Sequence, residues 1–126
     1  MLMKKVTMNL TSNKVMNKPE LIKYYDYLNE NKVIVFNSFY KLKNNRELKL
    51  SILLDGKNLD VLNSVEFEVN KATSSINIIS DKIDKILKTD DLKLIRSTLE
   101  LYADVIEDSI NYIDYVEDEV RNLINT

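Results

Sequence analysis

Carboxylates form the largest concentration of chemically active groups in this sequence. Eight of them lie between Ser97 and Val120, and no Lys or Arg interrupts them. Five recur at spacings of four, three, seven and four residues, which places them along one side of a helix. These five are Glu100, Asp104, Glu107, Asp114 and Asp118, and the other three are Asp108, Glu117 and Glu119. Such a row would present negative charge to a basic protein surface.

The same carboxylates could serve other chemistry, and the sequence argues against most of it. Oxygen ligands suit Ca²⁺ and Mg²⁺, but there is no EF-hand loop, and a chain without histidine cannot supply the Glu-x-x-His motif of a di-iron site. Acid–base cleavage of glycosides needs carboxylates inside a cleft, whereas these lie on the polar side of an amphipathic pattern. We expect either a solvated helix face without a partner or a surface that binds protein.

The charge density suggests one way in which such a surface could work. Eight carboxylates over about 20 helical residues give roughly one charge per 3–4 Å, close to the spacing of about 3.4 Å along one DNA strand. Mimicry of nucleic-acid charge is therefore one mechanism for binding a basic protein. Tyr112 and Tyr115 lie beside the apolar positions, and Tyr is enriched at binding hot spots. The predicted partner-binding residues are Glu100, Asp104, Glu107, Asp108, Tyr112, Asp114, Tyr115, Glu117 and Asp118.

A second, basic group of residues suggests an alternative function. Four cationic side chains surround Asn44-Asn45, with Phe39 and Tyr40 nearby: they are Lys41, Lys43, Arg46 and Lys49. On the tip of a β-hairpin, such residues could grip phosphates and stack on bases. Exposed lysines on edge strands also prevent strand-to-strand aggregation. We prefer the second explanation and keep nucleic-acid binding as the alternative.

Three absences argue against an enzyme. The chain has no histidine, the commonest acid–base group near neutral pH and the commonest metal ligand. It has no cysteine, and its one glycine, Gly56, is too few for a Walker or dinucleotide-binding loop. We therefore expect a non-enzymatic protein with no cofactor and no metal.

Length and composition set the broad class. A chain of 126 residues is most simply a single domain. Residues 1–57 carry 11 basic and 5 acidic side chains, whereas residues 58–126 carry 7 basic and 15 acidic ones. The opposite charges of the two halves could neutralise each other within the fold, or they could steer a charged partner towards the protein. No apolar run approaches the roughly 18–20 residues that span a bilayer, so we predict a cytoplasmic protein that does not bind membranes.

The choice of residues gives a hint of the source. The chain is rich in Lys, Asn and Ile and poor in Arg and Ala, as AT-rich codons would produce. This bias is typical of a low-GC bacterium, or of its phages and plasmids. In that setting, a small inhibitor, regulator or immunity-type protein is the specific function that we expect.

The acidic residues belong to the second of two long predicted helices. Apolar residues recur at alternating spacings of three and four from Leu62 to Ile86, and again from Leu92 to Leu123, with Ser109 as the exception. This pattern predicts an antiparallel helical hairpin of about 59–88 and 90–125, with the second helix starting near Thr89 or Asp90. Residues 65–69 also alternate as a strand would, so the sequence leaves open whether residues 59–70 form helix or strand; we favour helix. A homo-oligomer through the long helices is a further expectation.

The N-terminal half predicts a mixture of helix and strand. Asn17-Lys18-Pro19-Glu20 is typical of a helix start, and Asn29-Glu30-Asn31 should end that helix. The β-branched and aromatic run from Val33, and the alternation over residues 47–54, predict a β-hairpin at 33–54. Residues 4–10 alternate as a further strand. The predicted fold class is therefore α+β, a small antiparallel sheet followed by a long helical hairpin.

Overall fold

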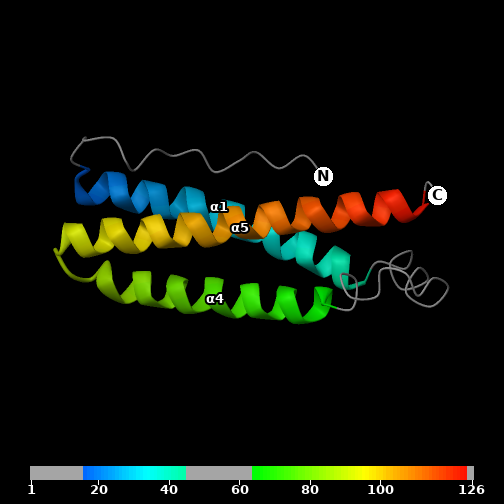
Figure 1. Ribbon diagram of the computed structural model, residues 1–126. Coiled ribbons are helices and arrows are strands. Elements are labelled where there is room, and N and C mark those ends of the chain that lie inside the picture. Colours follow the sequence, from blue (N-terminus) through cyan, green and yellow to red (C-terminus); the bar gives the residue numbers. More distant parts are fainter. Residues whose placement is uncertain (1–15, 45–63, 125–126) are drawn as a thin grey trace.

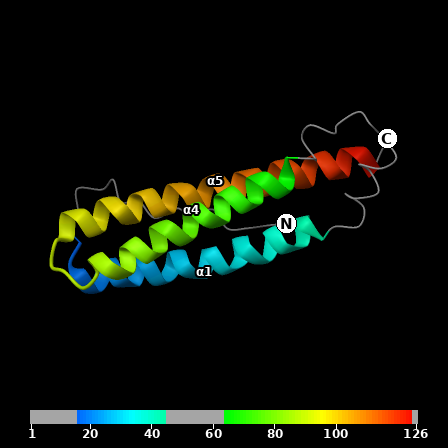
Figure 2. The ribbon, with the colours of Figure 1, turned by 90° about the horizontal axis from the view of Figure 1, so that it is seen from below.

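A computed structural model describes residues 16–44 and 64–124, and these residues form three helices (Figure 1). They are α1 (Lys18–Lys43), α4 (Val65–Ile86) and α5 (Leu92–Ile124). About 90% of the described residues are helical, and none of them lies in a strand. Figures 1 and 2 show α1 and α5 running in the same direction, with α4 antiparallel to both. The described part of the chain is all-α, so the predicted α+β class is wrong.

The start of α1 follows the sequence prediction. Asn17 is the N-cap, and its side-chain oxygen accepts a hydrogen bond of 3.0 Å from the backbone N–H of Glu20. Glu20 completes the capping box, because its carboxylate accepts from the backbone N–H of Asn17 at 3.4 Å. Pro19 lies in the first turn, where its missing N–H costs nothing. The local pattern alone was enough to place this end.

The predicted β-hairpin at 33–54 is wrong over its first strand, because α1 continues without a break to Lys43. Leu28, Val35, Phe39 and Leu42 are each at most 3% exposed. Their spacings of seven, four and three residues put them on one helical face that packs into the core. Burial along this face outweighs the modest preference of β-branched residues for strands. The rest of the predicted hairpin, and the strand at 4–10, lie outside the described residues.

The helix also passes through Asn29-Glu30-Asn31, where it was predicted to end. Asn31 donates from its side-chain nitrogen to the carbonyl of Tyr27, at 2.9 Å. The side-chain oxygen of Asn29 accepts from the hydroxyl of Tyr102 on α5, at 2.8 Å. Both amides therefore find partners while the backbone stays helical. Asparagine side chains compete with helical structure by bonding to nearby backbone groups, and here these two side chains bond without interrupting the helix.

The predicted helical hairpin is confirmed within the described residues. Residues 65–70, which could have formed a strand, are the first turns of α4, and residues 59–63 lie outside the description. We call the apolar residues of the two 3–4 spaced patterns the seam. Among its described members, Leu92 is 36% exposed, and Ala72, Ile79 and Ile86 are only partly buried. The seam residues that the structure buries are Val65, Val69, Ile76, Ile83, Ile95, Leu99, Tyr102, Ile106, Ile113, Val116 and Val120. Ser109 is buried as well, with its hydroxyl donating to the carbonyl of Val105 at 2.9 Å.

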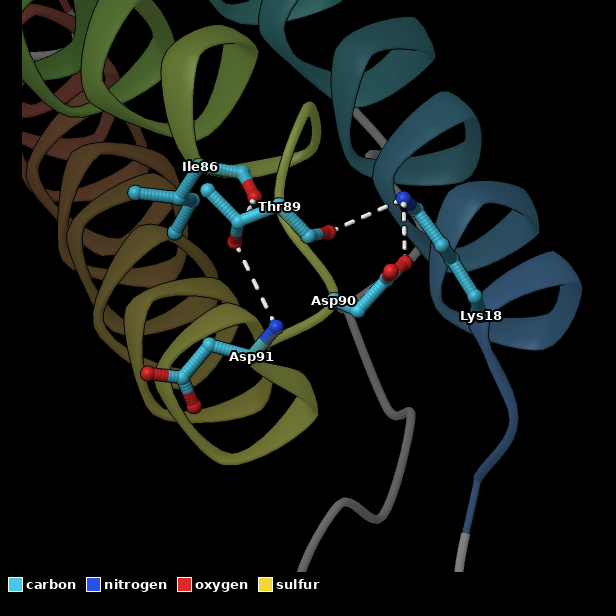
Figure 3. Close-up of polar contacts among 5 residues, drawn as sticks. All are labelled: Lys18, Ile86, Thr89, Asp90 and Asp91. Atoms are coloured by element: carbon cyan, nitrogen blue, oxygen red, sulfur yellow. Dashed lines mark hydrogen bonds and ion pairs between the residues drawn. The ribbon is translucent and has the colours of Figure 1, made fainter.

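The turn between α4 and α5 is capped by its own polar residues (Figure 3). The Thr89 hydroxyl donates to the carbonyl of Ile86 at 2.7 Å and accepts from the N–H of Asp91 at 3.3 Å. The carboxylate of Asp91 accepts from the N–H of Leu94 at 3.2 Å, so Asp91 serves as the cap of α5. The helix therefore starts at Leu92, slightly later than predicted.

The same turn is tied to the start of α1. Figure 3 shows the Lys18 ammonium reaching across from α1 to the turn. It donates to the carbonyl of Thr89 at 2.9 Å and pairs with the Asp90 carboxylate at 3.3 Å. The Asp90 side chain is almost fully exposed, so the charge pair adds little stability. The two contacts of Lys18 join the first turn of α1 to the turn between α4 and α5.

A largely buried polar cluster around Tyr25 connects the three helices. The Tyr25 hydroxyl on α1 lies 2.8 Å from a carboxylate oxygen of Asp84 and 2.9 Å from the hydroxyl of Ser80, both on α4. The ring of Tyr25 packs against that of Tyr102 on α5, with centroids 5.8 Å apart. Burial raises the pKa of both tyrosines. Both hydroxyls therefore stay neutral at physiological pH and act as fixed hydrogen-bonding groups.

Candidate partner-binding surfaces on the last helix

The structure separates the predicted partner-binding residues into two surfaces of α5. The larger surface faces outward on the side next to α1, and we call it the acidic stripe. Asp104 and Asp118 are exposed on it, and the other three members are partly exposed. Asp108 and Tyr112 lie instead on the flank of α5 that faces α4. The acidic stripe consists of Glu100, Asp104, Glu107, Asp114 and Asp118.

Cations pair with the acidic stripe only at its two ends, within the described part of the chain. Arg96 and Glu100 form an ion pair of 3.6 Å one helical turn apart. Near the C-terminus, Arg121 and Asp118 pair at 3.4 Å, with both side chains more than 60% exposed. The three acids between these pairs form no ion pair with a described Lys or Arg. Their charge is left for water, salt or a partner.

The basic residues of α1 do not neutralise the acidic stripe. Lys18 pairs with Asp90 at the turn, and Lys43 donates to the side-chain oxygen of Asn70 on α4 at 3.1 Å. No other lysine of α1 forms an ion pair with a described acid. Within residues 16–44 and 64–124, the lysines of α1 therefore form no salt bridge with the acids of α5.

The field of the acidic stripe reaches into the neighbouring core. Burial raises the pKa of Tyr24 on α1 to about 12, and the charges of Tyr27, Asp104, Glu100 and Glu107 add to the rise. The Tyr24 side chain is only 1% exposed. Three stripe carboxylates thus act together on one buried phenol, because charges interact more strongly across a medium of low dielectric.

On its other flank, α5 forms a hollow with α4 of about 330 Å³. Small side chains explain it: Ala72 and Ser75 of α4 meet Ser109 of α5 where larger residues would fill the seam. Ser109 is the one polar residue on the predicted apolar seam. The residues that line the hollow are Glu68, Lys71, Ala72, Ser75, Val105, Asp108, Ser109 and Tyr112.

Tyr112 forms part of the wall of this hollow rather than an exposed anchor. Its hydroxyl oxygen is buried and has no hydrogen bond of standard geometry in the described structure. Burial raises the pKa of Tyr112, the polar side chain of Ser64 lowers it in part, and the charge of Glu68 raises it further. A buried phenol of this kind contributes packing more than recognition.

Tyr115 and Glu117 fall outside both groups. The Tyr115 side chain is 48% exposed, between the acidic stripe and the flank that faces α4. Glu117 is partly buried.

Sequence reasoning missed the α4 half of the hollow, to which Glu68, Lys71 and Ser75 contribute. The small residues Ala72 and Ser75, close to the apolar seam of α4, were the available signal.

The predicted nucleic-acid site is not assembled as a hairpin tip. Lys41 and Lys43 lie in the last turn of α1, and Lys43 is bonded to Asn70. Arg46 and Lys49 lie outside the described residues. The residues that the structure does describe here are helical, so they cannot form the strand of a wing.

Comparisons with protein-family models, with curated protein sequences and with solved structures give no match for this chain. Within the described residues, no helix is long and apolar enough to cross a membrane. The same part of the chain brings no three acidic side chains close enough to share a metal ion. Any functional conclusion therefore depends on the surfaces themselves.

Proposed function

We propose that this protein is a non-enzymatic interaction protein that binds a basic protein surface through the acidic stripe of α5. The observation that carries the proposal is the row of carboxylates between Arg96 and Arg121, whose middle members form no ion pair with a described cation. Exposed like charges at these spacings weaken a helix slightly. A basic partner would relieve that repulsion and gain rapid association through electrostatic steering.

The specific form of this proposal is a small inhibitor, regulator or immunity-type protein. From Glu100 to Asp118 the stripe extends about 27 Å along a straight helix, a length suited to the nucleic-acid channel of a basic protein. Mimicry of a nucleic-acid strand would then block that channel. The straight course of α5, held by its buried inner face, keeps the charges in a fixed row (Figure 1).

Charge reversal on the acidic stripe tests the proposal. The full-length protein is used as bait in a lysate of its host, together with the variant Asp104→Lys/Glu107→Lys. A matched control, Asp26→Lys/Glu30→Lys, reverses two acids on the exposed side of α1. We expect wild type and control to retain the same basic protein, and the stripe variant to lose it. Equal retention by all three baits would reject the acidic stripe as the binding surface.

Salt and DNA then test how the captured protein is bound. We expect its affinity to fall several-fold between about 50 mM and 200 mM salt, because the contact is largely electrostatic. Double-stranded DNA should displace the bait if the stripe mimics nucleic acid. An affinity that is indifferent to salt would contradict electrostatic binding, and failure of DNA to compete would contradict mimicry alone.

A further inference from the structure

The α4–α5 pair has a side that α1 does not cover. Tyr25 of α1 contacts Ser80 and Asp84 on one flank of α4, whereas the hollow opens on the other flank. Leu101, with a side chain that is 51% exposed, lies beside the hollow on the same flank of α5. We call this side the open face and define it by Glu68, Ser75 and Lys82 on α4 and by Leu101, Val105 and Ser109 on α5. The exposed side chains of Lys71 and Asp108 also line its hollow.

The residues of the open face are arranged symmetrically about one level of the helix pair. Ser75 and Val105 both line the hollow, from opposite helices. Glu68 and Lys82 lie seven residues on either side of Ser75, and spacings of seven keep residues on one side of a helix. Leu101 and Ser109 lie four residues on either side of Val105. Glu68 and Lys82 are thus equally far in sequence from Ser75, and Leu101 and Ser109 from Val105, and the dimer proposed below takes Ser75 and Val105 as one level of the antiparallel pair.

A two-fold axis through this level, perpendicular to the helices, would make the face complementary to itself. Rotation by 180° exchanges residues that are equally far from the axis. Leu101 of one copy then enters the hollow beside the partner's Ser109, and Glu68 lies opposite the partner's Lys82. An isologous contact of this kind closes on itself, so it gives a dimer rather than a filament.

We propose that the open face is a homodimer interface, in which two α4–α5 pairs pack antiparallel as a four-helix bundle. Glu68 and Lys82 form no ion pair with another described residue, so both are available to a second copy. A four-helix bundle is a common arrangement of two helix pairs, and here Leu101 and Val105 would supply the apolar contact between polar and charged neighbours. This interface is separate from the acidic stripe, which stays exposed in both copies and does not depend on it.

The mass of the protein in solution is the first test. Sedimentation equilibrium of the full chain should give twice 14.7 kDa, and Leu101→Glu should give the mass of one chain with unchanged helicity. Val33→Glu is the matched control, since Val33 is 56% exposed on the outside of α1, and it should remain dimeric. A wild type that is monomeric up to millimolar concentration, or a Leu101→Glu variant that stays dimeric, would overturn the proposal.

A charge swap tests the pairing of Glu68 with Lys82. Glu68→Lys and Lys82→Glu should each raise the dissociation constant of the dimer by about tenfold, because each creates two like-charge contacts across the axis. The double variant Glu68→Lys/Lys82→Glu restores opposite charges and should return the constant to within about threefold of wild type. Additive weakening in the double variant would rule out this register.

Cross-linking tests the position of the axis directly. The chain contains no cysteine, so single cysteines report only on the site where they are placed. Ser75→Cys lies on the proposed axis and should cross-link between copies under mild oxidation at least tenfold faster than Ser74→Cys, which points outward from α4. Equal rates for the two variants would place the axis elsewhere and overturn the proposed arrangement. None of these readouts depends on the acidic stripe or its partner.

Discussion

The inner and outer faces of α5 differ completely in chemistry along the same helix. On the inner face, Ile106, Ile113 and Val116 are fully buried. On the outer face, Asp104 and Asp118 are exposed to solvent. Because both faces share one backbone, substitutions on them differ mainly in what the side chain touches. The comparison teaches that the two faces of α5 have different roles in stability: the inner face holds the bundle together, and the outer face exposes charge to solvent.

The largest expected effect is the loss of packing on the inner face. Ile106→Ala should lower the free energy of unfolding by about 2–5 kcal/mol, because it removes buried methyl groups and leaves a cavity. Urea denaturation followed by circular dichroism measures this. Asp104→Ala, on the outer face half a turn away, is the control and should change stability by less than about 0.5 kcal/mol. Similar losses for the two variants would mean that the faces are not distinct.

The next largest effect is expected on stability at alkaline pH. It involves Tyr24, a buried residue of α1 whose pKa is raised in part by the carboxylates of the outer face of α5. Its pKa is raised from 10.0 to about 12 in the folded state, so between these values the unfolded chain loses a proton that the folded chain keeps. Stability is therefore fully present below pH 10 and falls as the pH rises towards 12, by about 2–3 kcal/mol from this group. Burial also raises the pKa of Tyr25, Tyr102 and Tyr112, so Tyr24→Phe should make the decline shallower without abolishing it, as measured by urea unfolding at a series of pH values.

Tyr115→Phe is the matched control for the alkaline experiment. The Tyr115 side chain is 48% exposed on the outer part of α5, so removing its hydroxyl should leave the alkaline decline of the wild type in place. A Tyr24→Phe variant that declines as steeply as Tyr115→Phe would show that other groups govern alkaline stability.

A smaller loss is expected from the hydrogen bond between α5 and α1. Tyr102→Phe leaves the side-chain oxygen of Asn29 without its donor, and the change should cost about 1–2 kcal/mol. Thermal unfolding should show a lower midpoint with an unchanged helical spectrum. If Tyr102→Phe is as stable as wild type, this bond does not set the register of α1 against α5.

The helical hairpin could be predicted because its cause is local. The 3–4 spacing of apolar residues identifies the buried side of each helix from the sequence alone. On α4 these residues include Val65, Val69 and Ile76, and on α5 they include Ile95, Leu99 and Tyr102. The second half of α1 could not be predicted in the same way. Val33 and Ile34 favour a strand and are exposed in the helix, and the deciding contacts come from Leu28, Val35 and Phe39 packing in the core.

The candidate surfaces were predictable in part, for the same reason. Spacings of three and four residues placed the five acids of the stripe on one side of α5. They could not show that Asp108 and Tyr112, each one residue away from that spacing, turn towards α4. A step of about 100° per residue is enough to move a side chain to another face. The hollow needed residues of two helices, so the sequence of α5 alone could not reveal it.

The smallest expected effect is a gain in stability on the outer face. Glu107→Gln removes one of the like charges spaced three and seven residues along the acidic stripe, so it should stabilise the protein by a few tenths of a kcal/mol at low salt. At about 1 M salt the gain should vanish, because exposed charges are then screened within about 3 Å. Urea unfolding at the two salt concentrations measures it. A loss of stability at low salt would instead mean that the carboxylate of Glu107 makes a favourable contact in the folded chain. In that case the outer face would share the structural role of the inner one, and the stripe would hold less charge available to a partner.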